Sequence, residues 1–175
     1  MHLSLRYYGD PILRKKCKPV GAITSEIRQL VTDMIETMDQ ANGIGIAAPQ
    51  VGQLLSLFVL RNYIINEKGE MSLAKDVIVF INPELSYVSK ETLIEEEGCL
   101  SIPGIKADVV RPARIIIEAT DLTGKRFKEE LEGYNARVRL HENDHINGVL
   151  FVDRLDQEEK ARVAPLLRDI KKKKK

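Results

Sequence analysis

Residues 141–145 read HENDH and place two histidines four positions apart. On an α-helix, positions i and i+4 lie on one face, so His141 and His145 can point at a single metal ion. Glu142 is rotated off that line but stays near enough to take a proton from water on the ion. The spacing therefore predicts a hydrolytic metal centre rather than two histidines that meet by accident.

A hydrolytic centre of this kind usually has a third protein ligand. The only other histidine, His2, is expected at the protein surface. In metzincin proteases the pattern continues to a third histidine, but here Phe151 holds that position and cannot bind a metal. A downstream carboxylate, as in thermolysin-like sites, stays open as an alternative. The candidates are Asp153, Asp156, Glu158 and Glu159.

Cys99 is the better candidate for the third ligand. It stands in EEEGCLSIPG, after three glutamates and before a Pro-Gly pair, which indicates a loop rather than a core strand. A thiolate is a good ligand for soft divalent ions. Cys17, in LRKKCKPV, has no such setting and is interpreted as structural or exposed.

The elements that must position these residues follow from the hydrophobic pattern. Residues 24–42 have apolar side chains at helical spacing, with Thr24 or Ser25 to cap the start and Gly43 at the end. The runs LSLFVLR (55–61) and VIVFIN (77–82) predict strands, separated by a polar loop at 65–76. Residues 109–132 predict a hairpin that turns at 122–124, with Pro112 at a break or an edge.

Two more helices are expected in the second half of the chain. The first covers residues 134–146 and carries HENDH. The second begins near Asp156, because Asp156 and Glu159 have the spacing of a capping box, and Pro165 should kink or end it. Strands between helices predict an α+β fold with antiparallel sheets. We expect one domain over residues 1–170 and a basic, flexible tail at 171–175.

Composition limits the classes of function. A chain of 175 residues with 43% hydrophobic residues suits one domain with a sizeable core. The net charge of +1 and the absence of Trp give no footprint for DNA. No apolar run has the length of a membrane span, and the start lacks the apolar core of a secretory signal, so a cytoplasmic protein is expected.

Three motifs stand in order along the chain: GIGIAAPQ at 43–50, EGCLS at 97–101 and HENDH at 141–145. Together they resemble the signatures of the peptide deformylase family. The resemblance covers nearly the whole chain, including GDPILRKKCKPV near the start and GVLFVDRL after the histidines. It implies antiparallel sheets around a central helix that carries HExxH, with an N-terminal and a C-terminal helix. It also implies an enzyme that removes the formyl group from the N-terminal formylmethionine of nascent polypeptides.

The resemblance also implies roles for single residues. The implied metal ligands are Cys99, His141 and His145. Glu142 is implied as the general acid and base, with Gln50 and the backbone N–H of Leu100 as donors to the developing oxyanion. The residues implied to bind the substrate are Ile44, Gly45, Gly98, Tyr134 and Val138. The last two share a helical stripe with the histidines, so they either line the methionine pocket or pack in the core.

The resemblance implies one divalent metal ion, ferrous iron in the cell, with zinc, nickel or cobalt able to occupy the same ligands. The expected partners are formylmethionyl nascent peptides, with a transient ribosome contact by the lysine run 171–175. We expect a monomer that binds neither DNA nor membranes. The alternatives are a metallopeptidase with a carboxylate ligand and a non-catalytic binding protein, although no catalytic residue has been lost.

The chain departs from the family pattern at the catalytic helix. Leu140 precedes His141 where many members have Gln, which alters the hydrogen bonds around the ligands. Arg137 and Arg139 make the helix more polar than a buried helix should be. These two arginines therefore need acidic partners or a route to solvent.

Overall fold

The computed structural model describes residues 3–173, so His2 and the last two lysines, 174 and 175, lie outside the described residues. Within this range the fold is α+β, as predicted. Its three α-helices are α1 (Ser25–Gln40), α2 (Gly133–Ile146) and α3 (Gln157–Lys173). Three short 3₁₀ turns lie at Pro11–Arg14, Ala48–Val51 and Phe151–Arg154.

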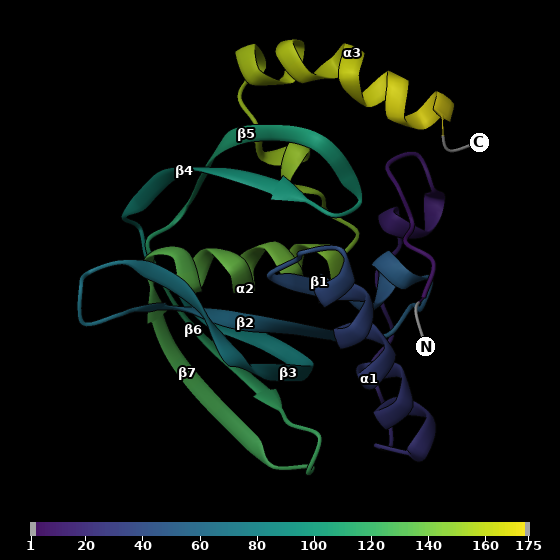
Figure 1. Ribbon diagram of the computed structural model, residues 1–175, viewed down its shortest axis with the longest axis vertical. Coiled ribbons are helices and arrows are strands. Elements are labelled where there is room, and N and C mark those ends of the chain that lie inside the picture. Colours follow the sequence, from purple (N-terminus) through teal and green to yellow (C-terminus); the bar gives the residue numbers. More distant parts are fainter. Residues whose placement is uncertain (1–2, 174–175) are drawn as a thin grey trace.

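The strands form two antiparallel sheets. They are β1 (Gly45–Ala47), β2 (Leu57–Ile65), β3 (Met71–Val88), β4 (Thr92–Cys99), β5 (Ile102–Pro112), β6 (Arg114–Thr120) and β7 (Arg126–Glu132). The larger sheet has the order β1-β2-β3-β6-β7, and β4 and β5 pair with each other. Helix α2 lies between the two sheets, while α1 and α3 lie at the periphery (Figure 1).

Apolar residues on the inner faces hold these layers together. Phe58 and Phe80 are paired across β2 and β3, and their rings stack at 4.7 Å beneath α2. Cys17 is buried in the same cluster, in agreement with a structural role. A second cluster joins α3 to β5 through Val163 and Leu167. The apolar packing thus fixes α2 against one sheet and leaves its histidine face toward β4 and β5.

The break predicted at Pro112 is confirmed and is where the chain changes sheets. β5 ends at Pro112 and β6 begins at Arg114, so the predicted first arm, 109–120, is divided between the two sheets. β6 then pairs with β7 around a turn in which Asp121 accepts hydrogen bonds from the backbone N–H groups of Thr123 and Lys125. The chain can therefore place β4 and β5 on the far side of α2.

Two local predictions are wrong. The polar loop at 65–76 is largely strand, because β2 continues to Ile65 and β3 begins at Met71. Of the two outcomes predicted for Pro165, an end to the last helix is wrong, because the helix runs to Lys173. Proline removes only one helical hydrogen bond, and burial of Val163 and Leu167 on either side of it holds the helix. The predicted boundary at residue 170 therefore falls inside α3.

Of the two predicted helix caps, one differs from the prediction and one agrees with it. Thr24 stands at the N-cap of α1, but its side chain makes no capping bond. Asp156 precedes α3 and its carboxylate accepts a hydrogen bond from the backbone N–H of Glu159 at 2.8 Å, as the capping pattern predicts. No helix among residues 3–173 is long and apolar enough to cross a membrane.

Candidate metal centre and active site

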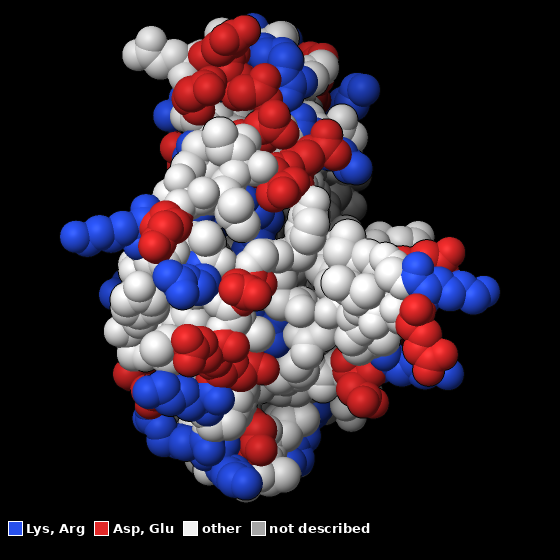
Figure 2. Space-filling view, turned by 90° about the vertical axis from the view of Figure 1, so that its left-hand side faces the viewer, with Lys and Arg blue, Asp and Glu red and all other residues white. Residues whose placement is uncertain are grey.

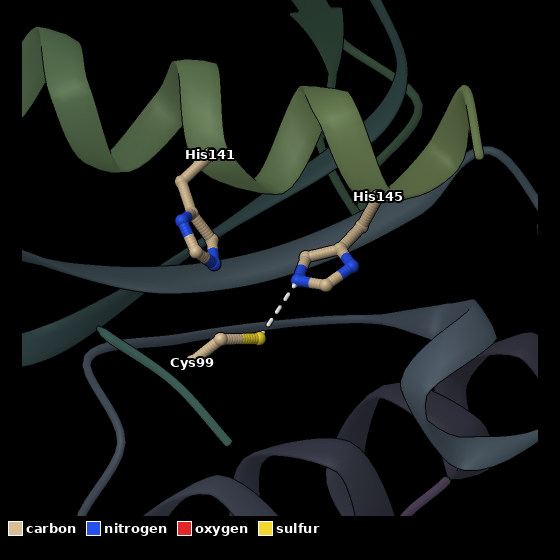
Figure 3. Close-up of side chains that lie close together, drawn as sticks. All are labelled: Cys99, His141 and His145. Carbon is tan, nitrogen blue, oxygen red and sulfur yellow. Dashed lines mark hydrogen bonds between the residues drawn. The ribbon is translucent and has the colours of Figure 1, made fainter. Parts of the chain in front are cut away.

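Cys99, His141 and His145 come together from two elements. Cys99 ends β4, and the two histidines lie one turn apart on α2. Their ligand atoms all lie within 4.8 Å of one another, and Cys99 Sγ is 3.2 Å from His145 Nε2. Figure 3 shows the three side chains pointing toward one another across the gap between α2 and the end of β4. The geometry is that of three ligands around one point.

The surroundings of these side chains fit a bound divalent ion. A thiolate and two imidazoles are a ligand set that zinc and other soft or borderline divalent ions accept. In residues 3–173, three buried polar side-chain atoms have no hydrogen-bond partner, and one of them, Glu142 Oε2, belongs to a side chain beside the ligands. Orphan polar atoms are costly unless water, an ion or a ligand completes them. The site is therefore suited to hold a metal ion and water.

Glu97 connects the site to a buried network of charges. Its Oε2 lies 2.9 Å from His141 Nδ1, which leaves Nε2 of that ring to face Cys99 and His145. Arg111 donates to both carboxylate oxygens of Glu97, at 2.6 and 2.9 Å. Burial alone would raise the pKa of Glu97, but the hydrogen bonds from Arg111 and His141 hold it well below its usual value. Glu97 is thus an anion that fixes the orientation of His141.

Three more charged groups, Arg137, Asp144 and Arg154, complete this network. Arg137 donates to Glu97 at 2.8 Å, and Arg111 also donates to Asp144 at 2.7 Å. Asp144 in turn accepts two hydrogen bonds from Arg154. Buried ion pairs of this kind depend on every partner, because removal of one leaves a charge without compensation.

We expect Glu97→Gln to lower the free energy of unfolding by about 3 kcal/mol, since it leaves the buried guanidinium of Arg137 without a counter-charge and Arg111 with Asp144 alone. Glu96→Gln is the matched control, because Glu96 pairs with Lys106 on the surface, where both side chains are more than half exposed. Denaturant unfolding of both variants measures the difference. Equal stability of the two variants would contradict the structural importance of the buried network.

Glu142 is buried beside the ligands and next to the glycine loop. Only 4% of the residue is exposed, and burial raises the pKa of its carboxyl to about 7. A Cβ atom added at Gly45 would lie 2.6 Å from Glu142 Oε1. The absence of a side chain at Gly45 therefore leaves the space that the carboxylate occupies.

Gln50 is held with its amide nitrogen toward the site. Its Oε1 accepts a hydrogen bond from the backbone N–H of Ala47 at 2.8 Å. Its Nε2 donates to Ser101 Oγ at 3.1 Å and lies 3.5 Å from Cys99 Sγ. Because the carbonyl oxygen is already engaged, the amide nitrogen is the group that Gln50 presents beside Cys99.

The predicted substrate residues border one cleft with a volume of about 830 Å³. Those predicted from the sequence that line it are Ile44, Gly45, Gln50, Gly98, Leu100, Tyr134, Val138 and Glu142. Cys99 and His141 open onto the same cleft, whereas Tyr134 lies at its rim and donates to Glu95 at 2.9 Å. The structure thus brings the three motifs to one concave surface.

The model of the polypeptide deformylase family matches residues 2–161. The chain belongs to the polypeptide deformylase family. Members of this family remove the formyl group from nascent peptides, and the chain is an enzyme of this class.

Two relatives support the assignment over nearly the whole chain. The chain is 41% identical to a peptide deformylase of Chlorobaculum parvum over 171 residues, which covers 98% of this chain and 89% of the relative. It is 42% identical to the chloroplastic peptide deformylase 1B of rice, over 95% of this chain but only 60% of that relative's length.

Solved deformylase structures share the fold. The structure from Legionella pneumophila superposes with a TM-score of 0.85 at 36% identity, covering 99% of this chain and 98% of the other. That from Thermotoga maritima has a TM-score of 0.80 at 40% identity, covering 89% and 99%. The deformylase fold therefore extends over most of the chain.

The two arginines of the deformylase helix α2 both have partners. Arg137 bonds to Glu97, and it also donates to the backbone carbonyl of Leu93 at 2.8 Å. Arg139 pairs with Glu129 at 3.0 Å and lies over the ring of Phe80. These partners explain how two arginines are buried on the central turns of the helix.

Sequence reasoning missed the charged residues around the deformylase ligands. Glu97 stands in the EGCLS motif, but the sequence predicted no contact between Glu97 and the histidines. It predicted no role for Arg111 or Asp144. A signal existed for Asp144, because it is an acidic residue inside HENDH. Arg111 is far from the histidines along the chain, so only the pairing of β4 with β5 reveals its contact.

We expect Gly45→Ala to lower the kcat for deformylation about 100-fold, because the new methyl group forces the Glu142 carboxylate out of place. Gly45 does not have a positive φ, so alanine fits the backbone. Gly21→Ala is the control, since a Cβ there meets nothing within 4 Å. Steady-state kinetics and thermal unfolding of both variants test this. A wild-type kcat in Gly45→Ala would contradict the close approach of residue 45 to the Glu142 carboxylate.

Proposed function

We propose that Cys99, His141 and His145 hold one catalytic divalent ion, and that Glu142 transfers the proton in hydrolysis of formylmethionyl peptides. The observation that carries this proposal is the convergence of three ligand atoms within 4.8 Å beside a buried carboxylate oxygen without a partner. When bound, such an ion supplies Lewis acidity and makes water a nucleophile near neutral pH.

Glu142 is the group that moves the proton. Its Oε2 has no partner in the described part of the chain, so it is available to accept a proton from the attacking water. The water oxygen bonds to the formyl carbon, the carbon–nitrogen bond breaks, and Glu142 returns the proton to the leaving amine. The products are formate and a free N-terminus.

Gln50 and the backbone N–H of Leu100 stabilise the oxyanion that forms on the formyl oxygen. Support for Gln50 comes from its anchored carbonyl, which holds the amide nitrogen toward Cys99 before the substrate arrives. Donors that are already oriented need no reorganisation when the charge develops. Such groups act on the transition state more than on the bound substrate.

The cleft accommodates the formylmethionyl end of the peptide. Ile44, Gly45 and Gly98 flank the peptide backbone, and Gly98 allows its close approach. Tyr134 and Val138 line the space for the methionine side chain. This assignment rests on their position along the cleft, on the same helical stripe as His141.

Gln50→Ala should lower kcat roughly 100- to 1,000-fold with a much smaller change in KM, because the lost donor acts on the developing charge. Gln53→Ala, an exposed glutamine on the same loop, should behave like the wild type. Initial rates of formate release over a range of peptide concentrations measure both parameters. A change in KM alone, with kcat unchanged, would contradict the proposed role of Gln50 as a donor to the oxyanion.

We propose ferrous iron as the physiological ion, with zinc, nickel or cobalt able to replace it. Elemental analysis of protein purified without oxygen should find one iron per chain. Exposure to air should inactivate that sample, since the thiolate of Cys99 is open to oxidation. One zinc per chain and full activity in air would overturn the choice of iron.

The remaining assignments stay predictions. They are a catalytic domain over 1–170 with a basic tail at 171–175, a transient ribosome contact by that tail, a monomeric state and a cytoplasmic location. Removal of residues 171–175 with unchanged co-sedimentation with ribosomes would dismiss the contact.

A further inference from the structure

An exposed apolar strip lies on one face of the hairpin formed by β2 and β3. Tyr63 pairs with Leu73 and Ile65 pairs with Met71 across the two strands. Residues two apart on a strand, and directly paired residues, project from the same face of a sheet. These four side chains are therefore neighbours, and we call them the hairpin strip.

The hairpin strip is largely open to solvent. Ile65 is 76% exposed, Met71 51% and Leu73 41%, while Tyr63 is partly buried. Apolar side chains gathered at an exposed site commonly mark a binding surface. The loop beyond them is polar and charged, so the strip ends at the tip of the hairpin.

The hairpin strip is continuous with the active-site cleft. Tyr63 lines the cleft, and its ring packs against that of Tyr134 with the centroids 5.6 Å apart. Asn135, at the start of α2, bonds to both the backbone N–H and the carbonyl of Tyr63, at 2.8 and 2.9 Å. The base of the hairpin is thus fixed beside the cleft wall, and Ile65 and Met71 lie farther out.

The end of the hairpin lies at the left of Figure 1, so Figure 2 looks onto this side of the molecule. Over most of that side, positive and negative side chains stand close together, with uncharged surface between them. No field of one sign dominates, which favours apolar contact over recognition of a charged partner.

We propose that the hairpin strip binds apolar side chains of the nascent polypeptide downstream of its second residue. This inference rests on the proposed function, because the cleft must hold the formylmethionine. An extended peptide rises about 3.3 Å per residue, so the strip is long enough for about two residues of substrate. The occupant is the substrate itself, since the strip begins at the wall of the cleft that the substrate fills.

Contacts so far from the formyl group act alike on the bound substrate and on the transition state. They lower KM and leave kcat unchanged. Partial burial of two leucine side chains against the strip should lower KM roughly fivefold relative to serines at the same positions. The enzyme would therefore favour nascent chains with apolar residues after the second position.

The test uses three formylated peptides: formyl-Met-Ala-Ser, and the same sequence extended by Leu-Leu or by Ser-Ser. The variants are the double replacement Ile65→Ser with Met71→Ser, and Ile64→Ser as the matched control. Ile64 is also exposed but pairs with Ser72 on the opposite face of the hairpin. Rates of formate release give kcat and KM for each enzyme form with each peptide.

The wild type and Ile64→Ser should both show the fivefold lower KM for the Leu-Leu peptide, and the double variant should not. Equal KM values in the wild type, or a preference that survives in the double variant, would overturn the inference. So would a wild-type dimer that the double variant loses in sedimentation, without any peptide preference. If neither the wild type nor any variant releases formate from formyl-Met-Ala-Ser, the result would instead contradict the proposed function.

Discussion

Cys99→Ser should purify without its divalent ion and without measurable formate release, whereas Cys17→Ser should keep both. A serine hydroxyl is a poorer ligand for soft ions than a thiolate, so the ion's affinity should fall by at least ~100-fold. Cys17 is a suitable control because it is the only other cysteine and is buried away from the ligands. Burial also raises the pKa of the Cys17 thiol to about 11, so it stays protonated near neutral pH.

Full occupancy in Cys99→Ser would favour the metallopeptidase alternative with a carboxylate ligand. The structure gives three of the four downstream carboxylates other contacts. Asp153 pairs with Arg14, Asp156 caps α3, and Glu159 pairs with Arg162. The group of ligand atoms found in residues 3–173 contains none of them. Elemental analysis of both cysteine variants, purified together without oxygen, decides between the two ligand sets.

Glu142→Ala should lower kcat about 10,000-fold while the protein keeps one ion per chain. The carboxylate is the proposed proton acceptor for water and the donor to the amine, and general acid–base groups contribute up to that magnitude. It is not among the three ligands, so its loss should not release the ion. Kinetics and elemental analysis on the same sample separate the two effects.

Asn143→Ala is the control for Glu142→Ala, because Asn143 is the next residue on α2 and is not among the ligands. It should retain both the ion and the rate. Substantial turnover by Glu142→Ala would assign the proton transfer to another group. Loss of the ion from that variant would show that Glu142 supports the metal site rather than the reaction.

The parts of the site that were predicted from the sequence are those with short-range signals. The spacing of His141 and His145 indicates one face of a helix, and α2 forms over nearly the predicted residues. The loop predicted around Cys99 is wrong, because β4 runs to Cys99, but the choice of Cys99 over Cys17 agrees with the structure, which brings Cys99 to the two histidines. The break at Pro112 could also be predicted, because proline has no backbone N–H to donate to a neighbouring strand.

The parts that could not be predicted depend on contacts between distant residues. Arg111 reaches Glu97 and Asp144 only because β5 pairs with β4 above α2. The strand at 71–76 contains Lys75 and Asp76 and lacks a buried face, so its pattern resembles a loop. The strand at 71–76 is stabilised by its pairing with β2. The strand propensities of its own residues do not predict this pairing.

The most direct test of the whole account is formate release by protein purified without oxygen, with formyl-Met-Ala-Ser and its acetylated twin as substrates. We expect formate from the formylated peptide and no cleavage of the acetylated one or of internal peptide bonds. A metal-replete sample that releases no formate, or that cuts an internal peptide bond, would contradict it.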